Sequence, residues 1–365
     1  MVAAMPQVDV TTPGSTYPVF IGTGLLERID TQLDQVPAAR QRRRLVVSSP
    51  GIWRLHGASL PRALRAEPAI LVPDGERQKT LPTVARIYDG LARAGADRAT
   101  VLVAFGGGVI GDMAGFAAAT WQRGISCVLV PTTLLAEVDS AIGGKTGVNH
   151  PLAKNMIGAF HQPAAVVSDT NVLSTLPRRE FRSGLYEVVK YGVIASNDLF
   201  TRLLTTLPAI FARTPDAIEP IVTESSRIKA SVVAADEREA GPRRVLNFGH
   251  TAGHALEAVT KYRRFRHGEA IAYGMLVAAE IAVRRKALDP ADRAALATLI
   301  AHMGPLPTIA DLSASETSDV IRRDKKVVAG KLHFVLPTGI GRVEIVDDVS
   351  QRELVRALKS VGLSG

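Results

Sequence analysis

Short apolar runs alternate with longer helical stretches through the first half of this chain, and this alternation constrains its fold more than any other feature. Val, Leu and Ile dominate the short runs at residues 45–48, 69–72, 100–105 and 127–130. Amphipathic stretches such as residues 81–94 lie between them. The alternation indicates a mostly parallel sheet covered by helices, with a ligand site at the carboxyl ends of the strands.

The second half of the chain has a different pattern. After Pro177, amphipathic helical stretches follow one another at residues 179–195, 220–235, 251–260, 268–287 and 290–302. We therefore expect an α/β nucleotide-binding domain at residues 1–177 and an essentially all-α domain at residues 178–365. Shorter elements are predicted near the ends of the chain, as strand pairs at residues 8–12 with 17–21 and 331–336 with 341–346, and a last helix at residues 351–359.

Composition limits the class of protein. The 365 residues suffice for two domains, and 46% hydrophobic with 22% charged residues is typical of a globular protein. No apolar run is long enough to cross a membrane, so we expect a cytoplasmic protein with no membrane partner. Cys127 is the only cysteine, and its apolar neighbours favour a buried, inert thiol over a catalytic one.

The charge of the chain favours anionic ligands. Its 44 Lys and Arg residues exceed its 35 Asp and Glu residues and give a net charge of +9. The basic residues are scattered and aromatic residues make up only 5%, so we expect no nucleic-acid partner. Small phosphorylated ligands fit the charge at least as well.

Two glycine-rich turns form the first candidate site. Residues 106–112 (GGGVIGD) stand between an apolar run and an alanine-rich helical stretch, and residues 143–147 (GGKTG) form the second turn. A glycine turn between strand and helix lets backbone N–H groups reach an anion at the helix N-terminus. The spacing matches neither the dinucleotide fingerprint nor the P-loop, so the pattern alone leaves simple chain reversal equally open.

Three of the eight histidines lie close together in the sequence and form the second candidate site. His250 and His254 are four residues apart, so on a helix they share one face and suit a metal ion. With His267 nearby, a metal or acid/base site is favoured over three structural histidines. Glu187 is a candidate carboxylate ligand, although an ordinary surface ion pair with Lys190 explains it equally well.

Taken in order, the motifs of the chain resemble those of the 3-dehydroquinate synthase family. The likeness runs from about Tyr17 to the end and rests on residues 106–112, 131–136, 138–140, 143–147, 154–155, 187–190, 246–251, 267–269 and 324–326. The resemblance implies two domains with the active site in the cleft between them, bound NAD, and a divalent metal, Zn²⁺ or Co²⁺. It also implies the second step of the shikimate pathway, in which 3-deoxy-arabino-heptulosonate 7-phosphate becomes 3-dehydroquinate and phosphate. That reaction combines transient oxidation by NAD, β-elimination of phosphate, re-reduction, ring opening and aldol closure.

Carried over by position, the resemblance implies Glu187, His250 and His267 as the metal ligands, in place of the His250 and His254 pair that spacing favours. Catalytic and substrate contacts are implied for His254, Asp139, Lys145, Lys154, Asn155, Lys190, Lys229, Arg243, Asn247 and one or both of Lys325 and Lys326. Cofactor contacts are implied for Asp74, Glu76, Lys79, Gly108, Val109, Ile110, Gly111, Asp112, Thr132, Thr133, Lys145, Lys154, Val172, Leu173, Ser174 and Thr175. Arg123 matches a residue that reaches the substrate phosphate of a neighbouring subunit, which implies a homodimer.

Departures from the family pattern are few. Ser48 and Ser49 stand where an acidic residue often contacts the adenosine ribose, and Tyr186 replaces a small residue beside the metal carboxylate. Three alternatives stay open: another NAD- and metal-dependent sugar-phosphate cyclase, a metal-dependent polyol dehydrogenase, and a non-catalytic basic binding protein. The retained metal-ligand and lysine positions favour an enzyme over the last of these.

Overall fold

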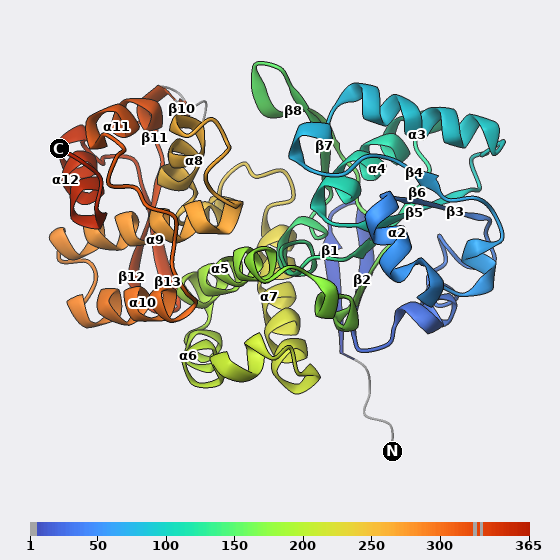
Figure 1. Ribbon diagram of the computed structural model, residues 1–365, viewed down its shortest axis with the longest axis horizontal. Coiled ribbons are helices and arrows are strands. Elements are labelled where there is room, and N and C mark those ends of the chain that lie inside the picture. The colour runs from blue at the N-terminus through green and yellow to red at the C-terminus, as the bar shows by residue number, and fades with distance from the viewer. Residues whose placement is uncertain (1–5, 324–326, 329–330) are drawn as a thin grey trace. The chain divides into compact units, whose positions relative to one another are not determined.

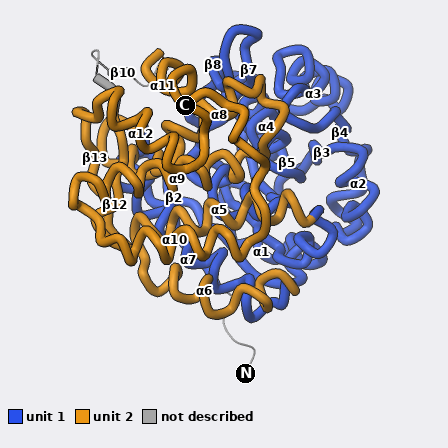
Figure 2. The backbone as a smooth tube through the Cα atoms, turned by 60° about the vertical axis from the view of Figure 1, so that its left-hand side comes forward, with its two compact units in different colours: residues 1–177, 213–238 blue, residues 178–212, 239–365 orange. Residues whose placement is uncertain are grey.

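The structure is a computed structural model that describes residues 6–323, 327–328 and 331–365. It divides into two compact units (Figure 2). Unit 1 comprises Met1–Pro177 and Arg213–Arg238, and unit 2 comprises Arg178–Ala212 and Glu239–Gly365. One of the division points therefore coincides with the expected boundary at Pro177, but the second half of the chain does not form one contiguous unit.

Within the described part of the chain, a seven-stranded sheet forms the centre of unit 1 (Figure 1). Its order is β1-β2-β9-β6-β5-β3-β4, and neighbouring strands are parallel except in the β1-β2 hairpin. Every residue of β5 is buried, as expected of a central parallel strand. The strands are β1 (Gln7–Thr12), β2 (Ser15–Gly22), β3 (Arg44–Ser48), β4 (Ile70–Leu71), β5 (Val101–Gly106), β6 (Ser126–Pro131) and β9 (Ala165–Asp169).

The helices of unit 1 follow the strands in the alternating order that the sequence predicts. In α3, the apolar positions Val84, Ile87 and Leu91 are buried on one face, and the Thr80 hydroxyl caps the first turn by accepting from the Thr83 backbone N–H. The α-helices are α1 (Ile29–Leu33), α2 (Pro50–His56), α3 (Leu81–Arg93), α4 (Gly108–Thr120) and α7 (Pro215–Ala235). Short helical turns are η1 (Leu26–Arg28), η2 (Gly57–Ser59), η3 (Arg62–Arg65), η4 (Glu76–Gln78), η5 (Trp121–Arg123), the π-helical η6 (Ala136–Ser140) and η7 (Thr170–Thr175).

Helix α7 belongs to unit 1, although the preceding segment Arg178–Ala212 belongs to unit 2. Its buried residues include Ile218, Ile221 and Val222, and it contacts β1, β2 and η6. The sequence predicts this helix but groups it with the second domain. Periodicity locates an amphipathic helix without indicating which surface covers its apolar face.

The two glycine turns lead into different structures. Residues 106–112 connect β5 to α4, as predicted, whereas residues 143–147 lead into a hairpin of β7 (Lys145–His150) and β8 (Ala153–Phe160). This antiparallel pair is separate from the central sheet and contacts α4. The second turn is therefore not the start of a helix, and neither strand of the hairpin is evident from the sequence pattern.

Unit 2 is built around α9, which is buried on most sides and contacts α5, α8, α10, α12 and β12. A helix with apolar residues around most of its circumference is typical of a core helix. No helix in the described residues is both long and apolar enough to cross a membrane. The elements are α5 (Arg178–Ala195), α6 (Asn197–Phe211), η8 (Pro242–Asn247), α8 (His250–Val259), α9 (His267–Arg284), α10 (Pro290–His302), α11 (Ala314–Arg323), β10 (Val327–Val328), β11 (Lys331–Leu332), β12 (Phe334–Gly339), β13 (Arg342–Val346) and α12 (Gln351–Val361).

Candidate active site

Helices α8 and α9 bring the three clustered histidines together in unit 2. His250 opens α8, His254 lies one turn further along it, and His267 opens α9. One nitrogen of each ring lies within 4.8 Å of the others. The two helices approach closely because residue 274 is glycine: a Cβ on Gly274 would lie 1.8 Å from the carbonyl oxygen of Gly249.

The Glu187 carboxylate on α5 is completely buried and faces two of these histidines. Its Oε1 atom lies 3.7 Å from His250 Nε2 and 3.5 Å from His267 Nε2. Its Oε2 atom lies 2.5 Å from Nζ of Lys190, one turn further along α5. The ion pair that the sequence allows on a helix surface is therefore present but buried, where a charged carboxylate needs such partners.

The Nδ1 atoms of two histidines face groups that accept protons. His250 Nδ1 lies 3.1 Å from the Phe248 carbonyl oxygen, which can only accept, so Nδ1 is the donor and the neutral ring has its lone pair on Nε2. His267 Nδ1 lies 3.6 Å from Oε2 of Glu257 on α8. In both rings Nε2 points toward Glu187 while Nδ1 faces an acceptor. Metal-binding histidines typically have one ring nitrogen on the metal and the other facing such an acceptor.

This set of donors fits a divalent metal ion. Burial acts to lower the pKa of His267, but the Glu187 and Glu257 carboxylates outweigh this effect and raise it to about 10, so the site favours positive charge. Imidazole nitrogens and one carboxylate oxygen form a donor set typical of catalytic zinc, and cobalt accepts the same ligand types. His254 lies in the same cluster. Glu187 and His254 are therefore both geometric candidates for the third ligand.

Arg243 and Asn247, both predicted to contact substrate, lie on η8 of unit 2. The Arg243 side chain is buried, and Asn247 Nδ2 donates to Oε1 of Glu239 over 3.1 Å. A buried guanidinium keeps its charge and can hold a carboxylate or phosphate in fixed geometry. The other predicted pair, Lys325 and Lys326, lies outside the described residues.

Glu257 is a site residue that the sequence prediction missed. It lies three residues after His254 and seven after His250 on α8, so it shares their helix face. This spacing could have identified it as a neighbour of the histidines. Its distance from His267, by contrast, depends on the packing of α8 against α9, which no local pattern encodes.

The first glycine turn places the predicted cofactor residues at the start of α4 in unit 1. β5 ends at Gly106, and Gly107 is the N-cap of α4. The Thr132 backbone N–H donates to the Gly106 carbonyl over 3.0 Å, which holds the end of β6 beside this turn. The first turn of α4 consists of predicted cofactor residues and can present backbone N–H groups to an anion; these are Gly108, Val109, Ile110 and Gly111.

Lys79 links the start of α4 to the β7-β8 hairpin. Its Nζ atom lies 2.5 Å from Oδ2 of Asp112 and donates to Oδ1 of Asn155 over 2.6 Å. Burial raises the pKa of Asp112, although Lys79 opposes this shift. Beside this cluster, Asn149 Nδ2 donates to Oε1 of Glu76 over 2.8 Å. The structure thus brings together residues that the resemblance assigns separately to cofactor and substrate.

Asp139 and Lys229, both predicted to contact substrate, form an ion pair within unit 1. Asp139 lies on the π-helical η6, and Lys229 lies on α7. Single π-helical turns occur often at functional sites. Because α7 packs on η6, this pair depends on the unexpected membership of α7 in unit 1.

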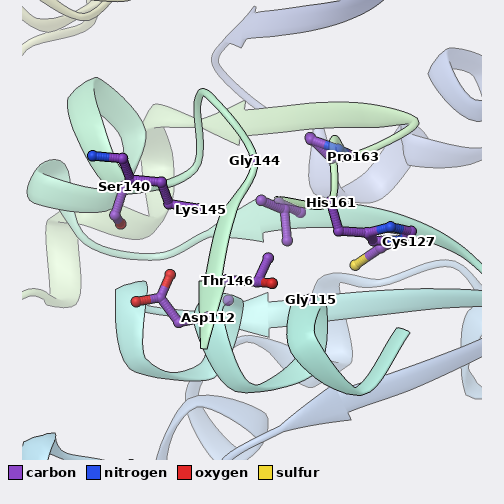
Figure 3. Close-up of a pocket in the computed structure, with 11 residues that line it drawn as sticks. Asp112, Gly115, Cys127, Ser140, Gly144, Lys145, Thr146, His161 and Pro163 are labelled. Carbon is purple, nitrogen blue, oxygen red and sulfur yellow. The ribbon is translucent and has the colours of Figure 1, made fainter. Parts of the chain in front are cut away.

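A small pocket lies beside the glycine turns (Figure 3). Asp112, Ser140 and Lys145 stand at one end of it in this view, with Cys127 and His161 at the other. Three predicted site residues, Gly111, Asp112 and Lys145, therefore share one pocket. Burial raises the pKa of the Cys127 thiol to about 12, so the thiol stays protonated near neutral pH, in agreement with the expected inert cysteine.

The remaining predicted residues of unit 1 lie on separate elements. Thr133 follows β6, and its Oγ1 atom accepts from the Ala136 backbone N–H. Asp74 follows β4, where its carboxylate accepts from the Gly75 backbone N–H. Lys154 lies on β8, and Arg123 ends η5 with a left-handed φ of 69°. The predicted cofactor segment forms most of η7, where Leu173 and Ser174 accept hydrogen bonds from Arg213; its residues are Val172, Leu173, Ser174 and Thr175.

Comparison with known families covers most of the chain. The 3-dehydroquinate synthase N-terminal family matches residues 69–183, and the 3-dehydroquinate synthase C-terminal family matches residues 184–327. The chain belongs to the 3-dehydroquinate synthase family. A curated 3-dehydroquinate synthase of Koribacter versatilis is 44% identical over 361 residues, which is 98% of each chain. The family resemblance inferred from the motifs is confirmed.

Solved structures confirm the predicted fold of this synthase family member. The 2-epi-5-epi-valiolone synthase of Streptomyces hygroscopicus, described with NAD⁺ and Zn²⁺ bound, has a TM-score of 0.84 and 27% identity, covering 95% of this chain and 97% of its own. A 2-deoxy-scyllo-inosose synthase complexed with carbaglucose-6-phosphate, NAD⁺ and Co²⁺ also has a TM-score of 0.84, with 26% identity, covering 97% of this chain and 99% of its own.

Proposed function

We propose that this chain is a 3-dehydroquinate synthase, a lyase that converts 3-deoxy-D-arabino-heptulosonate 7-phosphate to 3-dehydroquinate and phosphate. The observation that carries the proposal is the buried Glu187 carboxylate, which faces Lys190 and two histidines. The chain that contains this cluster belongs to the 3-dehydroquinate synthase family. A site of this kind suits a metal ion that binds a substrate alcohol.

Glu187, His250 and His267 would hold the metal ion, and residues at the start of α4 would hold NAD. When bound, the metal lowers the pKa of a substrate alcohol, and NAD accepts and later returns its hydride. The donor set supports Zn²⁺ and Co²⁺ alike. The relatives solved with NAD⁺ and with Zn²⁺ or Co²⁺ support the same pair of cofactors.

The basic residues of the site would hold the two anionic groups of the substrate. Elimination of phosphate builds negative charge that must be stabilised, and fixed Lys and Arg side chains do this without reorganisation. Lys190 also forms an ion pair with Glu187, which places a positive charge beside the proposed carboxylate ligand. Arg243 is buried and so holds its guanidinium in one orientation. The proposed anion-binding set is Lys145, Lys154, Lys190, Lys229, Arg243 and, from a second subunit, Arg123.

Biological context follows from the same proposal. We place the enzyme in the cytoplasm, as a homodimer, at the second step of the shikimate pathway toward aromatic amino acids and chorismate. These assignments rest on the family membership and on the motif resemblance.

A substrate panel with product identification tests the function. Purified protein with metal and a catalytic amount of NAD is expected to release phosphate and 3-dehydroquinate from the heptulosonate phosphate, with no net NADH. Net NADH formation from a polyol would indicate a dehydrogenase, and a different carbocyclic product from another sugar phosphate would indicate another cyclase. If no substrate reacts while nucleic acid shifts in a gel, the enzyme assignment is wrong.

A further inference from the structure

Glu257 is a buried carboxylate beside the candidate metal site. It lies on α8 with 5% of its surface exposed, and its Oε2 atom is 3.6 Å from Nδ1 of His267. A buried carboxylate is costly unless a charged or hydrogen-bonding group compensates it. His267 is a group of that kind within its reach.

His267 lies between two carboxylates that meet opposite sides of its ring. Its Nε2 atom is 3.5 Å from Glu187, and its Nδ1 atom faces Glu257. A neutral imidazole carries one proton, so a metal at Nε2 requires that proton to be on Nδ1. Glu257 is placed to accept it.

His250 provides an internal comparison, since its Nδ1 atom donates to the Phe248 carbonyl and its Nε2 atom also points toward Glu187. The two proposed histidine ligands thus share one design, in which an acceptor behind the ring fixes which nitrogen faces the metal. One acceptor is a neutral carbonyl and the other is a carboxylate. A carboxylate makes its imidazole the stronger donor to a metal.

We propose that Glu257 is a positioning residue for the metal site: it orients His267 through Nδ1 and strengthens Nε2 as a ligand without binding the metal itself. The role rests on the proposed function, because it presumes that His267 binds the metal. It adds a residue outside the motifs on which the family resemblance was built. It also explains why a carboxylate is buried at the end of α8.

The test measures Zn²⁺ affinity of the full-length protein by competition with a chromophoric chelator, without NAD or substrate. Glu257→Ala is expected to weaken binding by about 10- to 100-fold, as typical of such outer partners, with one Zn²⁺ still bound per chain. Glu257→Gln, whose amide oxygen can still accept from Nδ1, is expected to weaken it less. Glu137→Gln, which changes a fully buried glutamate of unit 1, is the matched control and is expected to bind as the wild type does.

Two results would overturn the proposal. Folded Glu257 variants that bind Zn²⁺ as tightly as the wild type would show that the contact has no positioning role. A loss as complete as that of His267→Ala would make Glu257 a ligand instead. If Glu257→Ala does not fold, the Gln variant decides between these outcomes. A wild-type protein that binds no Zn²⁺ or Co²⁺ would instead refute the proposed metal site, so the two failures are distinguishable.

Discussion

The Glu187 carboxylate is shared among Lys190, His250 and His267 inside unit 2. Removing one partner of a buried ion pair typically costs about 3–5 kcal/mol, because the other charge is left without compensation. Lys190 therefore contributes to the stability of unit 2 as well as to the site. It also holds one carboxylate oxygen in place, which leaves the other directed at the two imidazole rings.

Alanine substitutions distinguish the candidate ligands. We expect Glu187→Ala, His250→Ala and His267→Ala each to reduce Zn²⁺ affinity by more than about 100-fold, beyond the effect of an outer-shell residue, whereas His254→Ala largely preserves it. Metal content after dialysis, with circular dichroism as a control for folding, measures the effect. Equal metal loss in His254→Ala would restore the pairing of His250 and His254 that helical spacing favours, since all three rings lie in one cluster.

Glu137 is a second buried carboxylate, in the π-helical η6 of unit 1. Neither of its side-chain oxygens has a hydrogen-bond partner among the described residues. Burial raises its pKa well above the usual range, and the charge of Asp169 raises it further. In the folded protein Glu137 is therefore protonated at pH values where the unfolded chain is ionised.

This difference makes stability depend on pH. The contribution of Glu137 is fully present below its unfolded pKa of about 4.3 and is lost as pH rises through its higher folded pKa, by up to about 1.4 kcal/mol per pH unit. Glu137→Gln cannot ionise, so we expect its stability relative to the wild type to increase as the pH rises above the unfolded pKa of about 4.3 toward the raised folded pKa. Urea denaturation across this range measures it, and parallel profiles for the two proteins would contradict the assignment of a neutral Glu137.

At the scale of elements, the sequence predicts most of unit 1 and the long helices of unit 2. β3, β5 and β6 are apolar runs of strand length, and α9 and α10 show clear periodicity. β9 (Ala165–Asp169) is not evident, because it is short and ends in polar residues. Its strand conformation comes from parallel pairing with β2 and β6, which are distant in the sequence.

The candidate site is predictable only as far as local spacing reaches. The pair His250 and His254 follows from a separation of four residues on one helix. Glu187 and His267 join it because α5, α8 and α9 pack together in unit 2. Ser183 Oγ accepts from the Gly268 backbone N–H over 2.9 Å and so fixes the start of α9 against α5. Contacts of this kind arise from tertiary packing, which local spacing does not reveal. Only the family resemblance predicted Glu187 and His267 as partners of His250.

Contacts between elements that are distant in the sequence are not predicted from local patterns either, because they also arise from tertiary packing. Lys229 pairs with Asp139 because α7 returns to unit 1 after an intervening part of unit 2. The apolar face of α7 is buried against β1, β2 and η6. A domain boundary drawn from composition assumes that a unit is contiguous, and this chain does not meet that assumption.

At the scale of the whole molecule, the net charge of +9 suits an enzyme of anionic substrates, since positive charge raises the local concentration of phosphates and carboxylates. Most of the charged residues are scattered along the chain. One of them, Arg123, has a left-handed backbone conformation. It follows Gln122, and both residues have left-handed φ values, of 69° and 48°.

Arg123 is the residue that the family resemblance assigns to the active site of a second subunit. If it acts across subunits, Arg123→Ala and Glu187→Ala are each inactive alone but complementary in one dimer. In a mixed dimer, the subunit with intact Glu187 receives Arg123 from its partner. Random pairing of equal amounts would then restore about a quarter of wild-type activity, because half the dimers are mixed and each has one complete site.

Co-expression of the two variants with different affinity tags, followed by tandem purification, isolates the mixed dimer for assay. The expected result is activity close to half that of the wild-type dimer, at unchanged mass by light scattering. A mixed dimer as inactive as its parents would show that Arg123 serves the site of its own subunit, and an active wild-type monomer would remove the need for a partner. Because each parent has lost a different residue, recovered activity can arise only from a site to which both chains contribute.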